Sequence, residues 1–233
     1  MYNYYDNEND PYFINNQLFN NPFINQRGFR LPDTIDYSFK NYVQQDPLSK
    51  PTTNTYIKIL NLNNEMRRLW FEHIFWTRLV ILSIVNGSND LKYVSERLLQ
   101  NPIDFENQFS KYYSAEISKK FGTLLKEHLL IAADLVTAAK NQNNQTFTLL
   151  NDKWYKNADE IANFLNSINP YWNENDIKEM MYKHLDLTKS EAGAVISRKY
   201  EDSIKLFDEI QSQALKMADT FTEGLLKQFP NKF

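Results

Sequence analysis

The chain has 233 residues, of which 42% are hydrophobic and 15% aromatic, so it can bury a sizeable core within one large domain. Its 26 basic and 29 acidic residues give a net charge of −3 without a basic stripe, which argues against nucleic acid as a partner. Because the chain has no cysteine, disulfides, thiolate metal ligands and cysteine nucleophiles are excluded.

Residues 1–54 are expected to form an extended or disordered arm rich in asparagine, proline and aromatic side chains. Five of the eight prolines lie here, and the stretches 11–15 and 22–25 both combine proline with phenylalanine, isoleucine and asparagine. The arm is interpreted as a tail or strap, with docking to a protein partner or to another copy of the chain as the alternative. A homo-oligomer or a protein complex through the arm is therefore a hypothesis for this segment.

Neither a secretory signal nor a membrane span is visible in the sequence. Asp6 and Glu8 stand where a secretory signal would carry positive charge. The longest apolar run, residues 79–85, is far too short to cross a bilayer. We therefore expect a soluble cytoplasmic protein, with association to a spore as the alternative suggested by the composition of the arm.

Residues 55–233 are expected to form an all-α domain, an up-and-down four-helix bundle of ferritin-like general shape with short extra helices. The four long helices are predicted at about 55–85, 114–140, 147–167 and 188–227, and the short helices at 91–100 and 104–112. No convincing strand pattern interrupts them.

Helix ends are predicted from residues that favour caps and stops. Asn86-Gly87 should end the first long helix, and Asn101-Pro102 should stop the short helix before it. Asn173 should cap the helix that contains His184. Thr188-Lys189-Ser190-Glu191 matches a capping box, so a new helix is expected to start there.

All three histidines of the chain lie on apolar stripes with the three- and four-residue spacing of a helix face. The first stripe contains Leu62, Met66, Leu69, His73, Trp76 and Val80. His128 and His184 lie on similar stripes, and a fourth stripe carries Asn157. Each of these polar side chains is therefore expected to face the core.

Several motifs together resemble those of an uncharacterised family of bacterial helical proteins. They include Trp70-x-x-His73-x-x-Trp76-Thr77-Arg78, Trp154-x-x-Asn157-Ala158-Asp159-x-Ile161-Ala162-x-Phe164-Leu165 and His184-Leu185-x-Leu187-Thr188-x-x-Glu191-Ala192. The resemblance covers residue 60 to the C-terminus and implies a helical fold without an established activity. Glu72-His73-x-x-Trp76 is also similar to a stretch in the first helix of ferritin-like bundles.

Some members of this family carry the label acetylglutamate kinase. That enzyme class needs an open α/β sheet and glycine-rich phosphate loops. The five glycines of this chain are isolated from one another, and no phosphate-binding loop can be written with them. The sequence therefore argues against kinase chemistry.

A metal site inside the bundle is the sharpest hypothesis from the stripes. His73 and His128 fall near the middle of their helices, and Glu191 lies two turns beyond His184 on the same face. The predicted metal ligands are therefore His73, His128, His184 and Glu191. Imidazoles and a carboxylate suit a divalent transition metal such as Fe, Zn or Mn, with Ni as a further candidate.

The structural alternative is a buried polar network that fixes the register of the helices. In it the histidines would bond to Asn157, Thr77 and Glu191. Thr77 and Thr188, each four residues after a histidine, are also the candidates for orienting the second ring nitrogen in a metal site. The Glu-x-x-His pattern of di-iron bundles is absent, since tryptophan, leucine and methionine stand at positions 70, 125 and 181.

Charged residues close to the apolar stripes are expected to form ion pairs or to face solvent. Glu72 and Glu127 should face outward or pair with basic side chains. Arg78 is expected to pair with Asp202, Asp208 or Glu191, or to lie at the surface.

Three functions stay open from the sequence. The first is a metal-binding or redox bundle, oxidase-like or for storage, and the second is a structural or interaction protein that is not an enzyme. The third is an acid–base enzyme with His73 or His184 as the base. No catalytic residue can be assigned from the sequence.

Overall fold

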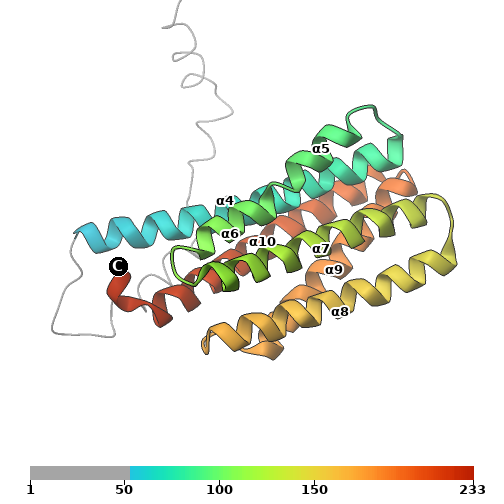
Figure 1. Ribbon diagram of the computed structural model, residues 1–233. Coiled ribbons are helices and arrows are strands. Elements are labelled where there is room, and N and C mark those ends of the chain that lie inside the picture. Colours follow the sequence, from blue (N-terminus) through green and yellow to red (C-terminus); the bar gives the residue numbers. More distant parts are fainter. Residues whose placement is uncertain (1–52) are drawn as a thin grey trace, which may run out of the picture. The chain divides into compact units, whose positions relative to one another are not determined.

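The computed structural model describes residues 53–233, and these residues are helical apart from short connections (Figure 1). The all-α prediction is confirmed for this part of the chain. The helices are α4 (Thr53–Asn86), α5 (Leu91–Leu98), α6 (Asn101–Phe109), α7 (Ala115–Lys140), α8 (Asn144–Ile168), α9 (Glu174–Ile196), α10 (Tyr200–Gln228) and a 3-10 turn η1 (Pro230–Lys232). Within these residues, no helix combines the length and apolarity that crossing a lipid bilayer would require. The predicted arm lies outside the described residues, except for residues 53 and 54.

The helices form three consecutive hairpins (Figure 1). α4 packs against α5 and α6, α7 packs against α8, and α9 packs against α10. The returning helices also connect the hairpins, because α6 contacts α7, α8 contacts α9 and α10 contacts α4. The first helices α4, α7 and α9 contact one another in all three pairs. They therefore occupy the inner positions and run in the same direction.

Two of the predicted helix ends are confirmed. α4 ends at Asn86, and Gly87 follows with a φ of +65°, a left-handed conformation that glycine adopts at little cost. Asn173 caps α9, and its side-chain oxygen accepts hydrogen bonds from the backbone N–H groups of Asn175 (2.9 Å) and Asp176 (3.3 Å).

One predicted helix start is wrong. α9 continues through the expected capping box, because the Thr188 hydroxyl donates back to the His184 carbonyl oxygen at 2.8 Å and Glu191 pairs with Arg78. The chain breaks later, at 197–199, so the predicted last helix is in fact α9 and α10. The predicted stop at Asn101-Pro102 agrees with the end of α5 at Leu98. The same pair also starts α6, earlier than the predicted start at residue 104, since proline is tolerated in the first turn of a helix.

The core has an aromatic end and an aliphatic end, with the three histidines between them. The aromatic end contains Trp70, Phe105, Phe109, Phe121, Trp172 and Phe221, whose rings contact one another. The aliphatic end contains Val80, Ile81, Ile84, Val94, Leu98, Leu129, Val136, Ala192 and Val195. The histidine layer therefore lies between two groups of apolar side chains.

Gly224 makes the tightest contact at the aromatic end. A methyl group at this position would lie 2.0 Å from Nε1 of Trp172, whose side chain is buried and whose indole N–H donates to the Thr220 carbonyl oxygen at 3.1 Å. We expect Gly224→Ala to lower the free energy of unfolding by about 1–3 kcal/mol or more, through overpacking.

Gly193, in α9, is the matched control, because nothing lies within 4 Å of an added methyl group. Gly193→Ala should raise stability by roughly 0.5–1 kcal/mol, since alanine is the better helix former. Urea unfolding of both variants measures the difference. Equal effects of the two substitutions would contradict the contact between Gly224 and Trp172.

Candidate metal centre

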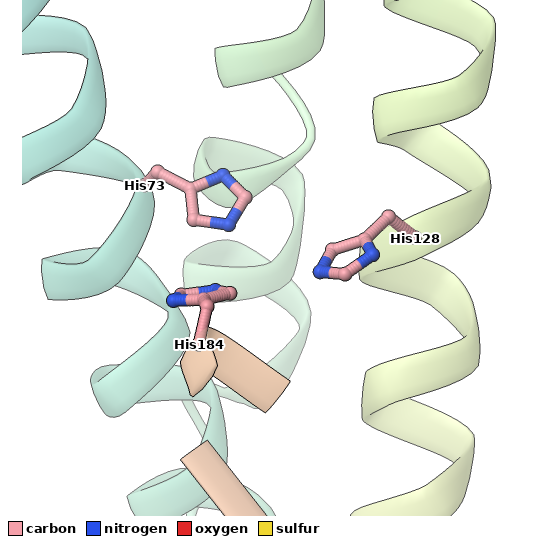
Figure 2. A group of neighbouring side chains, drawn as sticks. All are labelled: His73, His128 and His184. Atoms are coloured by element: carbon pink, nitrogen blue, oxygen red, sulfur yellow. The ribbon is translucent and has the colours of Figure 1, made fainter. Parts of the chain in front are cut away.

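His73, His128 and His184 meet in the interior of the bundle, one from each inner helix (Figure 2). Each side chain is only 2% exposed. The ring centroids lie 5.6 to 6.1 Å apart, and one nitrogen from each ring lies within 4.8 Å of the others. Around a tetrahedral zinc ion with Zn–N bonds of about 2.0–2.1 Å, the nitrogens would be about 3.3 Å apart. The three rings are thus close to the spacing of a shared ion.

The imidazoles of His73 and His128 are each oriented by an asparagine of the returning helix in the same hairpin. Nδ1 of His73 lies 3.1 Å from Oδ1 of Asn101, and Nδ1 of His128 lies 3.0 Å from Oδ1 of Asn157. Each asparagine also donates its N–H to a backbone carbonyl, that of Leu69 for Asn101 (2.9 Å). The amide oxygen is therefore the acceptor, and Nδ1 carries the proton.

This tautomer leaves Nε2 as the nitrogen with the free lone pair. In Figure 2 the rings of His73 and His128 each turn a nitrogen toward the space among the three side chains. A neutral imidazole with one N–H held by a protein acceptor and the other nitrogen facing inward is the form that binds metal ions.

Gln213 of α10 occupies the corresponding position beside His184. Its Nε2 donates to the Met180 carbonyl oxygen at 2.9 Å, but Oε1 of Gln213 and Nδ1 of His184 are both buried without a hydrogen-bond partner. Gln213 is half-buried and lines a groove of about 920 Å³ between α9 and α10, whereas Asn101 and Asn157 are almost fully buried. The third amide is therefore the one nearest to solvent.

The three hairpins repeat one local design. The backbone carbonyls held by the amides are those of Leu69, Leu124 and Met180, each four residues before a histidine. The amides follow their histidines by 28, 29 and 29 residues. Each amide therefore spans the same gap, between a histidine on the inner helix and the turn before it.

Burial keeps all three imidazoles neutral. It lowers the pKa of His73 to about 4, although the hydrogen bond that His73 donates to Asn101 acts in the opposite direction. It lowers the pKa of His128 to about 3, and the positive charge that His73 would carry lowers it further. Burial also lowers the pKa of His184, as do the charges that His73 and His128 would carry, and the nearby Gln213 side chain acts in the opposite direction. At neutral pH no proton therefore competes for the inward-facing nitrogens.

Glu191, the fourth predicted ligand, is not brought together with the histidines. Its side chain is buried, and its carboxylate pairs with Arg78 of α4, one of the three acidic partners predicted for that arginine. The same guanidinium donates to Oγ and the carbonyl oxygen of Ser203 on α10 (3.1 and 3.3 Å). Burial raises the pKa of Glu191 to about 7, and Arg78 opposes the shift. The role of Glu191 as a ligand stays a prediction.

The predicted role of the two threonines in orienting the rings is wrong. Thr77 and Thr188 donate their hydroxyls to the backbone carbonyls of His73 and His184, at 2.6 and 2.8 Å. This happens because the residue four positions on in a helix reaches the preceding carbonyl more readily than the outward ring nitrogen.

Comparison with protein-family models, with curated proteins and with solved structures finds no match.

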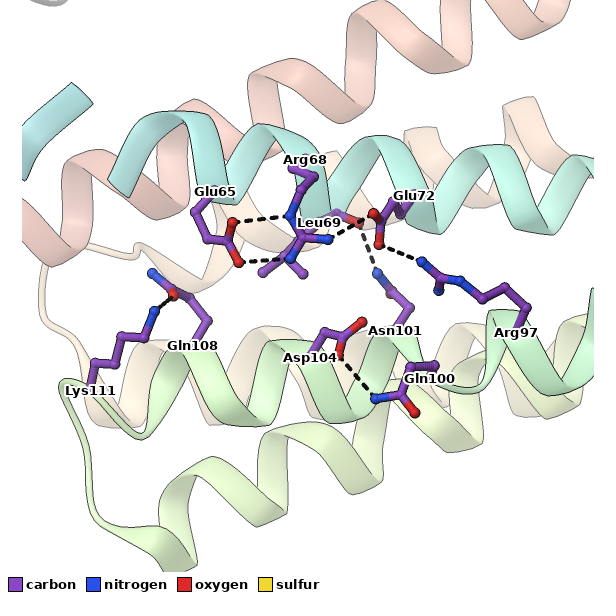
Figure 3. A network of polar contacts seen from close by, with 10 residues as sticks. All are labelled: Glu65, Arg68, Leu69, Glu72, Arg97, Gln100, Asn101, Asp104, Gln108 and Lys111. Carbon is purple, nitrogen blue, oxygen red and sulfur yellow. Dashed lines mark hydrogen bonds and ion pairs between the residues drawn. The ribbon is translucent and has the colours of Figure 1, made fainter. Parts of the chain in front are cut away.

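The outer face of α4 carries the expected ion pairs (Figure 3). Arg68 pairs with Glu65 and Glu72 at 2.7 Å, and Arg97 of α5 pairs with Glu72 at 3.0 Å. Figure 3 also shows Asn101 reaching from α6 to Leu69 on α4, just inside this charged face. Glu72 is thus held on the outside, as predicted, and is not directed toward the histidines.

The apolar stripes of the sequence indicate the three histidines and Asn157 but give no sign of Asn101 or Gln213. The proline after Asn101 indicates a helix stop at that position instead. Gln213 lies on a partly exposed face of α10. The signal that could have found both is the nearly constant interval from each histidine to an amide side chain.

Proposed function

We propose that this protein binds a single transition-metal ion through Nε2 of His73, His128 and His184. The observation that carries the proposal is the convergence of three buried, neutral imidazoles, two of them fixed in the inward-facing tautomer by Asn101 and Asn157. Such oriented imidazoles are typical of metal sites, where a second protein group holds the outer ring nitrogen.

The donor set narrows the choice of ion. Three neutral imidazoles suit Zn²⁺ and Fe²⁺, whereas Mn²⁺ prefers the carboxylates that the group of histidines lacks. Three protein ligands leave one tetrahedral position for an exogenous ligand, which is the arrangement of reactive rather than purely structural sites. We therefore propose Zn²⁺ or Fe²⁺ as the natural ion, with Mn²⁺ as the weakest of the three.

The unpaired atoms at His184 fit this proposal. A rotation of the Gln213 amide or of the imidazole would bring Oε1 of Gln213 and Nδ1 of His184 into the hydrogen bond that the other two hairpins already have. A bound ion would favour this rotation, because it would hold Nε2 of His184 inward and leave the proton on Nδ1, where Gln213 can accept it. The resemblance to the uncharacterised helical family and to ferritin-like bundles remains a proposal about relationship and adds no ligand.

Titration of chelator-treated full-length protein with Zn²⁺, Fe²⁺ under anaerobic conditions, and Mn²⁺ tests the function. We expect about one Zn²⁺ or Fe²⁺ per chain after gel filtration, measured by elemental mass spectrometry, and little Mn²⁺. At a free ion concentration 100 times the Kd, binding should raise the free energy of unfolding by about 2.7 kcal/mol. Absence of stoichiometric binding by any of these ions would favour the structural polar network instead.

The supporting amides provide a further prediction. Asn157→Leu keeps the volume of the side chain but removes the acceptor at His128 Nδ1, so the affinity for Zn²⁺ should fall about 10- to 100-fold. Asn169→Leu is the matched control, because Asn169 is equally buried but bonds to Tyr113 and Tyr171 instead of a histidine.

Both leucine variants should lose stability, since each removes a buried hydrogen-bonding group. Only Asn157→Leu should lose zinc affinity, measured by competition with a chromophoric chelator. Equal affinities in the two variants would show that the amide of Asn157 does not support a metal ligand.

A further inference from the structure

A cavity lies one helical turn beyond the three histidines, on the aliphatic side of the layer. Thr77, Ala132 and Thr188 line it, and each is four residues after one of the histidines. Because the three inner helices run in the same direction, these residues form the next layer along the bundle, about 6 Å away. The cavity therefore lies on the side of the histidine layer from which a fourth ligand could approach, although the histidines themselves do not line it.

The lining of this cavity is apolar in spite of its two threonines. The hydroxyls of Thr77 and Thr188 are bonded to backbone carbonyls, which leaves their methyl groups for the cavity. The other lining side chains are mostly aliphatic, among them Val80, Ile81 and Leu129. A water molecule needs two to four polar partners to be stable in such a space, and this lining does not offer them.

Two further lining residues carry polar groups: Lys189, whose amine donates to Asn151 and Tyr155, and Trp154. The ring of Trp154 lies 5.2 Å from that of His128, and its indole N–H is buried without a hydrogen-bond partner. A buried unpaired donor costs about 1–3 kcal/mol, and a ligand that reached this N–H would offset part of that cost.

We propose that this cavity binds a small, neutral, apolar diatomic molecule of the dioxygen class next to the metal ion. The inference rests on the proposed metal site and specifies the ligand of its fourth position. The cavity volume of about 20 Å³ exceeds the roughly 10–15 Å³ needed for one water-sized molecule on the same scale and excludes an organic substrate. A largely apolar lining suits a diatomic gas better than it suits water or an anion.

The experiment uses two probes, xenon for the cavity and nitric oxide for the metal. Xenon occupies dry apolar cavities and does not depend on a metal. Nitric oxide added to protein that has first been shown to hold one Fe²⁺ gives an iron–nitrosyl with a characteristic electron paramagnetic resonance signal. We expect wild-type protein to bind xenon in the cavity and to give the nitrosyl signal.

The decisive variant is Ala132→Val, which fills the cavity from α7, and Ala138→Val is the control. Ala138 is equally buried on the same helix but does not line the cavity. Ala132→Val should keep its iron, lose xenon binding and bind nitric oxide at least tenfold more weakly. Ala138→Val should behave as wild type. Val80→Ile, which adds a single methyl group to the lining, replaces Ala132→Val if the latter does not fold.

The outcomes separate the two proposals. Iron binding without a nitrosyl signal, or equal nitric oxide affinity in Ala132→Val and Ala138→Val, overturns the inference and leaves the metal site intact. Failure to bind iron overturns the proposed function. In that case the cavity cannot hold a ligand of the metal ion, so the inference is also overturned, even if xenon still enters the cavity.

Discussion

Replacing His184 with phenylalanine is expected to lower the affinity for Zn²⁺ by roughly two to three orders of magnitude. Structural zinc sites with four ligands supply about 10–16 kcal/mol, or roughly 2.5–4 kcal/mol per ligand. Phenylalanine keeps an aromatic ring in the core, so the loss reflects the missing nitrogen rather than a cavity. His184 is chosen because its Nδ1 has no hydrogen-bond partner, and its removal leaves only the Gln213 oxygen unpaired, as it already is.

Glu191→Gln is the matched control for the loss of a ligand. Glutamine has nearly the same shape and can still accept a hydrogen bond from Arg78, so the variant should lose about 1–3 kcal/mol of stability and keep its zinc affinity. Calorimetric titration of both variants provides the comparison. If Glu191→Gln lost zinc as His184→Phe does, the carboxylate would be a ligand and the ion pair with Arg78 would have to rearrange.

The metal-free protein is expected to lose stability steeply as the pH falls below 6.5. In the unfolded chain the three histidines take up protons near pH 6.5, whereas in the folded protein His73 does so only near pH 4 and His128 only near pH 3. His184 is also shifted downward. The stability that these neutral imidazoles contribute is therefore fully present above pH 6.5 and is lost as the pH falls toward 4.

Glu191 acts in the opposite direction. Its pKa is raised from 4.5 to about 7 by burial, so between these values the folded protein holds a proton that the unfolded chain lacks. The unfolded chain binds three protons at the histidines, and the folded protein binds one at Glu191. The unfolded chain therefore binds about two more protons than the folded protein. The free energy of unfolding should thus fall by about 3 kcal/mol per pH unit between about pH 6 and 5.

Urea unfolding of the metal-free protein at several pH values measures this slope. The His184→Phe variant should show a slope smaller by about one proton, or about 1.4 kcal/mol per pH unit. A stability that is flat or rises on acidification in this range would contradict the burial of three neutral imidazoles.

Much of the fold follows from short-range rules that the sequence displays. The stripe around His73 predicts a buried helix face because residues three and four apart share one side. Asn86-Gly87 and Asn173 mark real helix ends because their caps are local. The predicted capping box at Thr188 and Glu191 is wrong because Thr188 bonds to the carbonyl of the preceding turn of α9, and because Glu191 pairs with Arg78 of α4, a tertiary partner that no local pattern reveals.

The sequence predicts the three histidines of the site but not most of the amide side chains that orient them. Histidine on an apolar stripe is conspicuous, whereas Asn101 beside proline and Gln213 on a partly exposed face are common outside metal sites. The three hairpins also escape a search for sequence repeats, since what recurs is a spacing of about 28 or 29 residues between a histidine and an amide rather than a motif. Only the packing of each returning helix against its inner helix makes that spacing meaningful.

The most direct test of the central claim is X-ray absorption spectroscopy of the protein loaded with one equivalent of Zn²⁺. The account predicts an ion with three imidazole nitrogens and one further light ligand at about 2.0–2.1 Å, with the outer-shell scattering of three imidazole rings. A first shell of oxygens with fewer than two imidazoles would contradict the convergence of His73, His128 and His184 on one ion.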